Sequence, residues 1–279
     1  MRPAAVAGYF YPGGKKALRE EIKESFLSTH GPRRSPSVLT SDVRTAVAAV
    51  MPHAGYTYSG PVAAHGYYQL SLQPDPDTVV LIGPNHTGVG VAVAIEDRGF
   101  WETPLGTVEI DAGLAQAIQA EAPLVQVDYS AHAGEHSIEV QVPFLQSIFP
   151  RFKIVPIVML SQDLGTSREV GEGIARACKG REALVISSSD LTHYESQRSA
   201  ERKDRLVLKA METLDEDVLV NTVYRHGISM CGYGPVAASI CAAKALGASH
   251  GRILKYSTSG NVTSDLRQVV GYASVLFER

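Results

Sequence analysis

Five residues of this sequence have side chains that can bind a divalent metal or transfer protons. They are His53, His86, Asp190, His193 and Cys231. Histidine and cysteine are ligands for iron, copper and zinc, and histidine and aspartate also act as acids and bases. If the fold brings these residues together, they form a pocket of the kind that binds a divalent metal.

Four of the five residues come just after short apolar runs. His53 follows the first run, and His86 follows the second behind a Gly-Pro pair that stops it. Asp190 and His193 follow the third run. Ligands of open α/β sheets bind outside the carboxyl ends of strands, so these positions are natural candidates for a site. The runs are Ala46–Met51, Thr78–Ile82 and Ala183–Ser187.

Cys231 lies in a Gly-rich turn, CGYGP, that opens a predicted helix. A thiol at a helix N-terminus has a lowered pKa, so we expect Cys231 to be a good ligand or nucleophile. Cys178 and Cys241 lie in Ala-rich helical patterns and are expected to be small buried hydrophobic residues. Three cysteines at wide spacing predict no disulfide framework, which favours a reducing compartment.

Further polar residues flank these positions. The candidates for lining the pocket or supporting its ligands are Glu135, His136, Asn85 and Tyr56. Glu135 and His136 open a predicted helix, and capping that helix is an alternative role for them. Asp190 could cap the helix that follows it in the same way. Tyr58 lies in the same motif as Tyr56 and either lines the pocket or packs in the core.

The same residues also permit chemistry without a metal. Cys231 could be a nucleophile, with His193 as its base and Asp190 as the group that orients the base. Asp190 and His193 are three residues apart, which allows a hydrogen bond between them but does not require one. A cysteine hydrolase is therefore an alternative to a metal centre.

The elements that must position these residues alternate between strands and helices. This order predicts a three-layer α/β/α sandwich with a mixed, mostly parallel central sheet. The apolar runs lack alternation, which suits strands that are buried on both faces. Residues 88–110 are expected to form an antiparallel addition to the sheet, with two strands that flank a loop. Residues 30–41 are rich in proline and serine and are expected to form a loop. The other predicted strands are Val91–Ile95, Lys153–Met159 and Val269–Phe277. The predicted helices are Lys15–Ser28, Pro61–Leu70, Ala112–Ala120, Ser137–Phe149, Ser167–Ala177, Ser196–Leu214, Asp215–Tyr224 and Val236–Leu246.

Length and composition are those of an ordinary globular protein. The 279 residues are 44% hydrophobic and 20% charged, which suits one domain over residues 1–279. A net charge of −3 without a basic stripe argues against a nucleic-acid partner. No apolar run has the roughly 18 residues that a membrane span needs, and no leader pattern is present, so we expect a cytoplasmic protein.

Six motifs of the sequence, in order, resemble those of the Memo family. The resemblance extends from Ala5 to Leu276, and six ordered matches make it specific. The motifs are VAGYFYP (6–12), PHAGYTYSG (52–60), GPNHTG (83–88), EHSIEVQVPFL (135–145), SSDLTHY (188–194) and CGYGP (231–235).

The resemblance implies a fold similar to the class III extradiol dioxygenase (LigB-like) fold. It also implies that His53, His86 and Cys231 are the metal ligands, with Asp190 and His193 as catalytic residues of the pocket. The metal implied is Fe(II) or copper, and zinc also suits these ligands. The dioxygenases have a carboxylate where this chain has Cys231, so ring cleavage is the activity that we expect least.

Two kinds of function remain open from the sequence. One is a metal-dependent oxidoreductase that acts on a small molecule, and the other is a non-catalytic adaptor that binds a peptide or partner in the ancestral pocket. Animal members of the family resemble signalling adaptors and are linked to metal-dependent redox chemistry. Some prokaryotic members occur beside radical-SAM and AMMECR-type proteins, which makes such a protein an expected pathway partner.

Overall fold

The computed structural model describes residues 1–36 and 41–279. Residues 37–40 of the loop predicted at 30–41 therefore lie outside the described residues. The strands are β1 (Ala46–Met51), β2 (Thr78–Pro84), β3 (Val93–Ile95), β4 (Phe100–Thr103), β5 (Gly106–Glu109), β6 (Gln126–Val127), β7 (Lys153–Met159), β8 (Ala183–Ser188), β9 (His193–Glu195), β10 (His250–Thr258) and β11 (Val269–Glu278). The helices are α1 (Lys15–Leu27), α2 (Tyr56–Ser71), α3 (Ala112–Glu121), α4 (Ser130–Ala133), the 3-10 turn η1 (Glu139–Gln141), α5 (Val142–Ile148), α6 (Leu164–Cys178), α7 (Gln197–Glu212), α8 (Glu216–His226), α9 (Tyr233–Ala245) and α10 (Gly260–Thr263).

One mixed sheet runs through the molecule in the strand order β10-β11-β1-β8-β2-β7-β3-β6. Strands β1, β8, β2 and β7 are parallel neighbours at its centre. Strand β11 pairs antiparallel with β1, and β3 pairs antiparallel with β7. The short strand β9 pairs with β11 beside this path. The parallel centre places the carboxyl ends of β1, β8 and β2 at one edge of the sheet.

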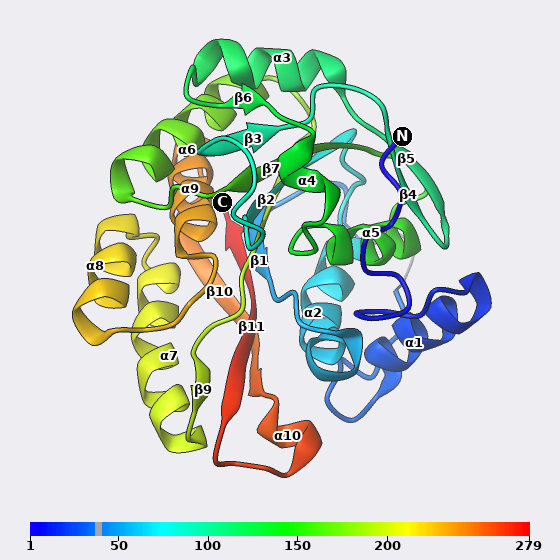
Figure 1. Ribbon diagram of the computed structural model, residues 1–279, viewed down its shortest axis with the longest axis vertical. Coiled ribbons are helices and arrows are strands. Elements are labelled where there is room, and N and C mark those ends of the chain that lie inside the picture. The colour runs from blue at the N-terminus through cyan, green and yellow to red at the C-terminus, as the bar shows by residue number, and fades with distance from the viewer. Residues whose placement is uncertain (37–40) are drawn as a thin grey trace.

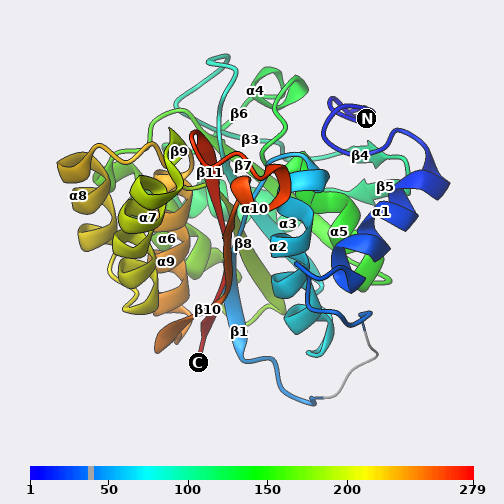
Figure 2. The ribbon, with the colours of Figure 1, turned by 90° about the horizontal axis from the view of Figure 1, so that it is seen from below.

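Helices cover both faces of this sheet (Figure 1). Figure 2 shows α6, α7, α8 and α9 on one side of the strands and α1, α2 and α5 on the other. The helix α3 joins the first group, because its buried side chains pack in the same cluster as those of α6 and α9. This arrangement confirms the predicted three-layer α/β/α fold with a mixed sheet.

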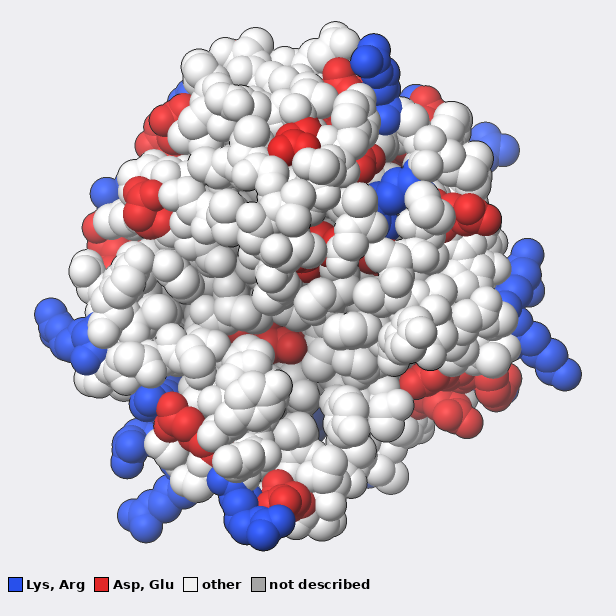
Figure 3. Space-filling model, viewed as in Figure 1, with Lys and Arg blue, Asp and Glu red and all other residues white. Residues whose placement is uncertain are grey.

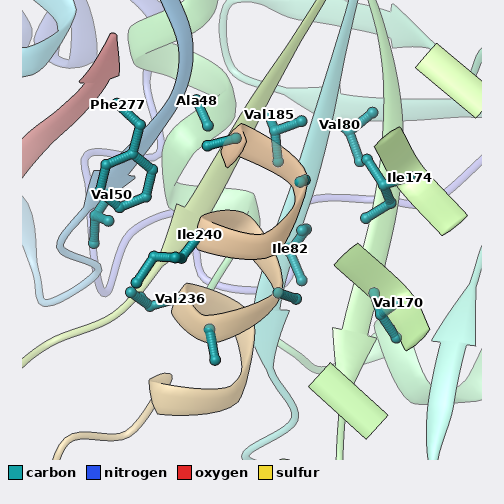
Figure 4. Close-up of a cluster of buried hydrophobic side chains, with 14 of the residues drawn as sticks. Ala48, Val50, Val80, Ile82, Val170, Ile174, Val185, Val236, Ile240 and Phe277 are labelled. Carbon is teal, nitrogen blue, oxygen red and sulfur yellow. The ribbon is translucent and has the colours of Figure 1, made fainter. Parts of the chain in front are cut away.

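The central strands bury side chains on both faces, as their apolar runs predict. In β2, for example, Val80 and Ile82 pack in the cluster under α6 and α9, whereas Val79 and Leu81 pack in the cluster under α2. Figure 4 shows the first of these clusters, in which strand side chains meet those of α6 and α9. Burial on both faces holds the strand ends, and hence the loops after them, in fixed positions.

Most predicted elements match the structure, with a few differences. The helix predicted at Pro61–Leu70 begins at Tyr56, with Pro61 inside it rather than at its start. The helix predicted at Ser137–Phe149 is a short 3-10 turn followed by α5. The antiparallel strands expected in residues 88–110 are the hairpin of β4 and β5. Strand β10 went unpredicted, because an edge strand with charged residues such as Arg252 and Lys255 lacks an apolar run.

None of the helices in the described ranges combines the length and apolar character that crossing a membrane requires.

Candidate metal centre

Three of the predicted site residues lie at adjacent strand ends. His53 is two residues beyond β1, Asp190 is two residues beyond β8, and His86 is two residues beyond β2. Strand β8 pairs in parallel with both β1 and β2, so the three ends point to the same edge of the sheet. Ligand sites of open α/β sheets occupy this edge.

Cys231 comes to the same edge from the turn between α8 and α9. The next residue, Gly232, packs directly on the end of β8, where its amide donates to Ser189 Oγ at 3.0 Å. A Cβ atom at position 232 would clash with the carbonyl oxygen of Ser188 and lie 2.8 Å from Ser189 Cβ. Only glycine fits this contact, which brings Cys231 against the strand end.

His53, His86 and Cys231 form a compact group of ligand atoms. One ligand atom from each side chain lies within 4.8 Å of the others, and Cys231 Sγ is 3.1 Å from His53 Nε2. The rings of His53 and His86 are 5.2 Å apart in an edge-to-face arrangement. His53 is buried, whereas 33% of the His86 side chain is exposed to the pocket side.

Hydrogen bonds around Ser188 fix the tautomer of His53. The Ser188 hydroxyl has one proton, which it donates to the carbonyl oxygen of Ser137 at 2.6 Å. Gln141 Nε2, which also donates to Pro52 O, donates to Ser188 Oγ at 2.8 Å. The 2.9 Å contact between His53 Nδ1 and Ser188 Oγ therefore has the imidazole as donor. His53 Nε2 is left with its lone pair facing Cys231.

A carboxylate fixes His86 in the same tautomer. His86 Nδ1 lies 2.9 Å from Glu135 Oε1, which accepts the ring proton and leaves Nε2 free. Glu135 also accepts the backbone amides of His86, His136 and Ser137. Burial acts to raise the pKa of Glu135, but these hydrogen bonds outweigh it and lower that pKa to about 2. Glu135 thus orients His86, and its own oxygens are occupied by hydrogen-bond donors. The ligand atoms of His86, Glu135 and His136 also lie close enough together to hold a metal.

Asp190 bonds to the backbone of the site. Its Oδ1 accepts the amide of His53 at 2.8 Å, and its own amide lies 3.3 Å from Cys231 Sγ. Burial raises the pKa of Asp190 to about 6. The prediction that Asp190 caps the next helix is wrong, because α7 begins at Gln197 behind Ser196.

The expected low pKa of Cys231 is not found. Burial, followed by the neighbouring Asp190, raises the pKa of the Cys231 thiol above its ordinary value. Hydrogen bonds from the amide of Asp190 and the hydroxyl of Ser189 lower the pKa but do not outweigh these effects. A thiol must lose its proton to bind a metal, so metal binding at Cys231 has to displace a proton.

His193 faces the pocket in a third fixed orientation. Its Nδ1 lies 2.7 Å from Leu191 O and 2.8 Å from Ser229 O. Both partners are carbonyl oxygens that only accept, so Nδ1 has the proton and Nε2 of the neutral ring has a lone pair. An imidazole in this state can accept a proton from a molecule in the pocket.

The arrangement of a cysteine hydrolase is absent from these contacts. The imidazole next to Cys231 Sγ is that of His53, and His193 Nδ1 bonds to backbone carbonyls rather than to Asp190. The chain of contacts that the sequence allowed, from Cys231 to His193 and from His193 to Asp190, is therefore not formed. The geometry favours a metal centre over this alternative.

Beside the ligand group lies a cavity of about 800 Å³, within the range of small-molecule sites. The cavity lies between the strand ends and the segment formed by β9, α10 and the start of β11. Of the five residues predicted to bind a metal or transfer protons, His53, His86, Asp190 and His193 are in the lining and Cys231 is not. The other lining residues are Phe10, Ala54, Gly55, Tyr58, His136, Tyr194, Ser259, Thr263, Asp265, Gln268, Val270 and Tyr272.

The remaining predicted residues have different places. His136 lines the cavity, where its ring stacks on His86 at 4.6 Å and contacts Phe10 at 4.4 Å. Asn85 is buried and bonds within its own turn, to Thr87, Gly88 and Val89, so it shapes the loop that carries His86. Tyr56 is buried too, and its hydroxyl donates to Val140 O, so it packs in the core while Tyr58 lines the cavity.

Several residues of the site were missed from the sequence. Ser188 and Gln141, which orient His53, are ordinary polar residues without a metal-binding signal. Ser188 belongs to a serine run at a strand end, and that position was the one available clue. Tyr194 and Tyr272 enter the cavity from β9 and β11, whose pairing no local pattern indicated.

The donor set fits a divalent metal. Two imidazoles present Nε2 lone pairs beside a sulfur atom, and each imidazole is held by a hydrogen bond at Nδ1. Metal-binding histidines typically have this second hydrogen bond, which fixes the ring and its tautomer. Two nitrogens and one thiolate suit copper, zinc or iron.

Comparisons with known proteins point to one family. A family model described as Memo-like protein matches residues 2–276. A MEMO1 family protein of Methanopyrus kandleri is 48% identical over 100% of this chain and 99% of its own length. Those of Methanothermobacter thermautotrophicus and Methanocaldococcus jannaschii are 46% and 45% identical, over 98% and 100% of this chain and 99% of each relative.

A solved structure shares the fold at lower identity. It is the crystal structure of an uncharacterized protein from Escherichia coli K12, with a TM-score of 0.56 and 17% sequence identity. The match covers 84% of this chain and 100% of that one. At this identity the likeness is evidence for the fold alone.

Proposed function

The chain belongs to the Memo-like protein family, and on that premise we propose that it binds a divalent redox metal, iron or copper, and acts in metal-dependent redox chemistry on a small molecule. His53 Nε2, His86 Nε2 and Cys231 Sγ would hold the metal. The observation that carries the proposal is the common tautomer of the two histidines, which leaves both lone pairs beside the sulfur.

The protein's own residues support such chemistry in several ways. A bound iron or copper ion would supply one-electron redox chemistry and a positive charge for an oxygen or substrate atom. His193 accepts a proton through Nε2, since backbone carbonyls hold its Nδ1–H. Asp190 keeps the His53 backbone in place through its 2.8 Å hydrogen bond and positions the thiol through its amide. Phe10 and His136 form an aromatic wall beside His86.

Metal content after anaerobic purification tests the proposal. We expect about one iron or copper ion per wild-type chain by elemental analysis, and loss of that metal in Cys231→Ala and His86→Ala. Cys241→Ala is the matched control, because Cys241 is a buried cysteine in α9 that does not belong to the group of ligand atoms. Its metal content should equal that of the wild type.

Redox activity is the second readout. Metal-replete wild-type protein should consume oxygen or peroxide faster than the Cys231→Ala variant does. Wild-type protein that takes up neither iron nor copper under reducing, anaerobic conditions would contradict the proposal. Full metal content in Cys231→Ala would contradict the ligand set.

A further inference from the structure

Within the described part of the chain, the lining of the cavity beside the metal centre has no fixed cation. Among the residues that the structure describes, neither lysine nor arginine lines it. Figure 3 shows the face with the strand ends, where most Lys and Arg side chains lie around the periphery and acidic atoms are visible in the central hollow. A phosphate or carboxylate ligand would therefore meet no guanidinium or ammonium partner in this lining.

The amides at the start of the two helices near the cavity already have acceptors in the protein. At α2, the Tyr56 amide donates to Phe10 O at 2.8 Å, and the preceding amides of His53 and Ala54 bond to the Asp190 carboxylate. At α9, the amides of Gly232 and Gly234 donate to Ser189 Oγ and Gln162 Oε1, both at 3.0 Å. These amides are therefore not available to an anion in the cavity.

The polar groups that face the cavity are mainly hydrogen-bond acceptors. His193 presents an Nε2 lone pair. The Asp190 carboxylate accepts the amides of His53 and Ala54 and keeps further lone pairs, since a carboxylate has about four acceptor sites. Asp265 also lines the cavity, but Arg267 pairs with both of its oxygens at 3.0 and 2.7 Å, so it is not a free acceptor. A ligand that donates hydrogen bonds is better matched to these groups than one that accepts them.

Aromatic rings form the rest of the wall. Phe10, Tyr58, Tyr194 and Tyr272 line the cavity. Tyr194 is 72% exposed and has a φ of 58°, a left-handed conformation that bulky residues rarely adopt. Such strain persists where the surrounding structure imposes it, often at ligand sites. Its ring lies 5.8 Å from the ring of His193, at an interplanar angle of 67°.

From these observations we propose that the cavity binds a small molecule that carries a protonated amine, held by the tyrosine faces and the free acceptors. Aromatic faces attract organic cations, and the neighbouring Asp190 carboxylate adds to this attraction. The inference rests on the proposed function, because it places the ligand in the cavity beside the proposed metal centre. The preference for a cation should persist when a metal is bound. The negative charges of Cys231, Asp190 and Glu135 would offset the charge of a divalent ion.

Three probes of similar shape test the charge preference by isothermal titration calorimetry. Phenethylamine is cationic, 2-phenylethanol is uncharged and phenylacetate is anionic at pH 7. We expect phenethylamine to bind about tenfold more tightly than 2-phenylethanol, and phenylacetate to bind least, in metal-free and zinc-loaded protein. Equal affinities for all three, or tightest binding of phenylacetate to metal-free protein, would overturn the proposal.

Variants of Tyr194 test the contribution of the aromatic face. Tyr194→Leu should lower the preference for phenethylamine over 2-phenylethanol by about threefold, whereas Tyr194→Phe keeps the ring and should retain it. An unchanged preference in Tyr194→Leu would overturn the role of this ring. Elemental analysis of the same samples separates the two proposals: normal metal uptake without amine preference refutes this inference alone, and amine preference without metal uptake refutes the metal centre alone.

Discussion

Three imidazoles of the site share one arrangement. His53, His86 and His193 each have Nδ1 in a hydrogen bond to an oxygen, so that Nε2 is the free nitrogen in each ring. The oxygens differ: a serine hydroxyl, a carboxylate and two backbone carbonyls. Burial, followed by the nearby histidines His86, His136 and His193, also lowers the pKa of His53 well below its usual value. Protonation of His53 therefore does not compete with a metal near neutral pH.

The serine hydroxyl gives a direct test at this scale. Ser188→Ala removes the acceptor of His53 Nδ1, so we expect metal affinity to fall about 10- to 100-fold in a chelator competition titration. Ser187→Ala is the matched control, because Ser187 is an equally buried serine on the same strand whose hydroxyl bonds to Ala49 O. If both variants bind metal equally well, Ser188 does not orient His53.

At the scale of elements, the turn before α9 determines where Cys231 lies. Gly232→Ala should move this turn away from β8, because the new Cβ clashes with Ser188 O. We expect a loss of about 1–3 kcal/mol in the free energy of unfolding and weaker metal binding. Gly14→Ala, where a Cβ meets no atom within 4 Å, is the control. Wild-type metal affinity in Gly232→Ala would show that the close contact is dispensable.

Helix α4 supplies a pH-dependent contribution to stability. Burial, with the neighbouring Arg2, lowers the pKa of His132 to about 3. The unfolded chain binds a proton on this histidine below about pH 6.5, but the folded chain does not until about pH 3. The contribution of neutral His132 to the free energy of unfolding is therefore fully present above pH 6.5 and is lost progressively as the pH falls toward 3.

His132→Phe removes this linkage and retains an aromatic ring beside Trp101. We expect the change in unfolding free energy between pH 7 and pH 5 to shrink by about 2 kcal/mol relative to the wild type. Urea unfolding at the two pH values measures it. The exposed His226 of α8 provides the control variant His226→Phe. The same pH dependence in all three proteins would contradict the assignment to His132.

The elements also show which parts of the site a sequence can predict. The predicted positions of His53, His86 and Asp190 at strand ends match the structure. Strands that are buried on both faces leave continuous apolar runs in the sequence, and these runs can be recognised. The pKa of Cys231 was predicted in the wrong direction, since its burial and the approach of Asp190 depend on tertiary contacts. Tyr194 and Tyr272 were missed because the pairing of β9 with β11 joins segments far apart in the chain.

At the scale of the whole molecule, the N-terminal segment is tied to the site through Glu139. This buried carboxylate pairs with Arg2 at 2.7 Å and accepts the amides of Ala5 and Val6 and the hydroxyl of Tyr11. Phe10, which belongs to the same segment, contacts His136 in the cavity. The cavity wall thus depends on a segment that one carboxylate holds in place.

Glu139→Gln should release this segment. Because it leaves the buried Arg2 without its charged partner, we expect a loss of about 3–5 kcal/mol in unfolding free energy and faster limited proteolysis before Lys15. Glu109→Gln is the control, because its pair with Lys153 is about half exposed and should contribute less than about 1 kcal/mol. Similar stability losses in both variants would contradict the special role of Glu139.

The position of β11 within the sheet has a consequence for synthesis. Strand β11 lies between β10 and β1 in the sheet, although about 220 residues separate it from β1 in the chain. During translation, β1 leaves the ribosome long before the strand that covers its edge. Until then that edge offers unpaired backbone groups to any neighbouring nascent chain. Chaperone protection is therefore most needed in this interval, and stalled products that lack β11 should be the species most prone to aggregate.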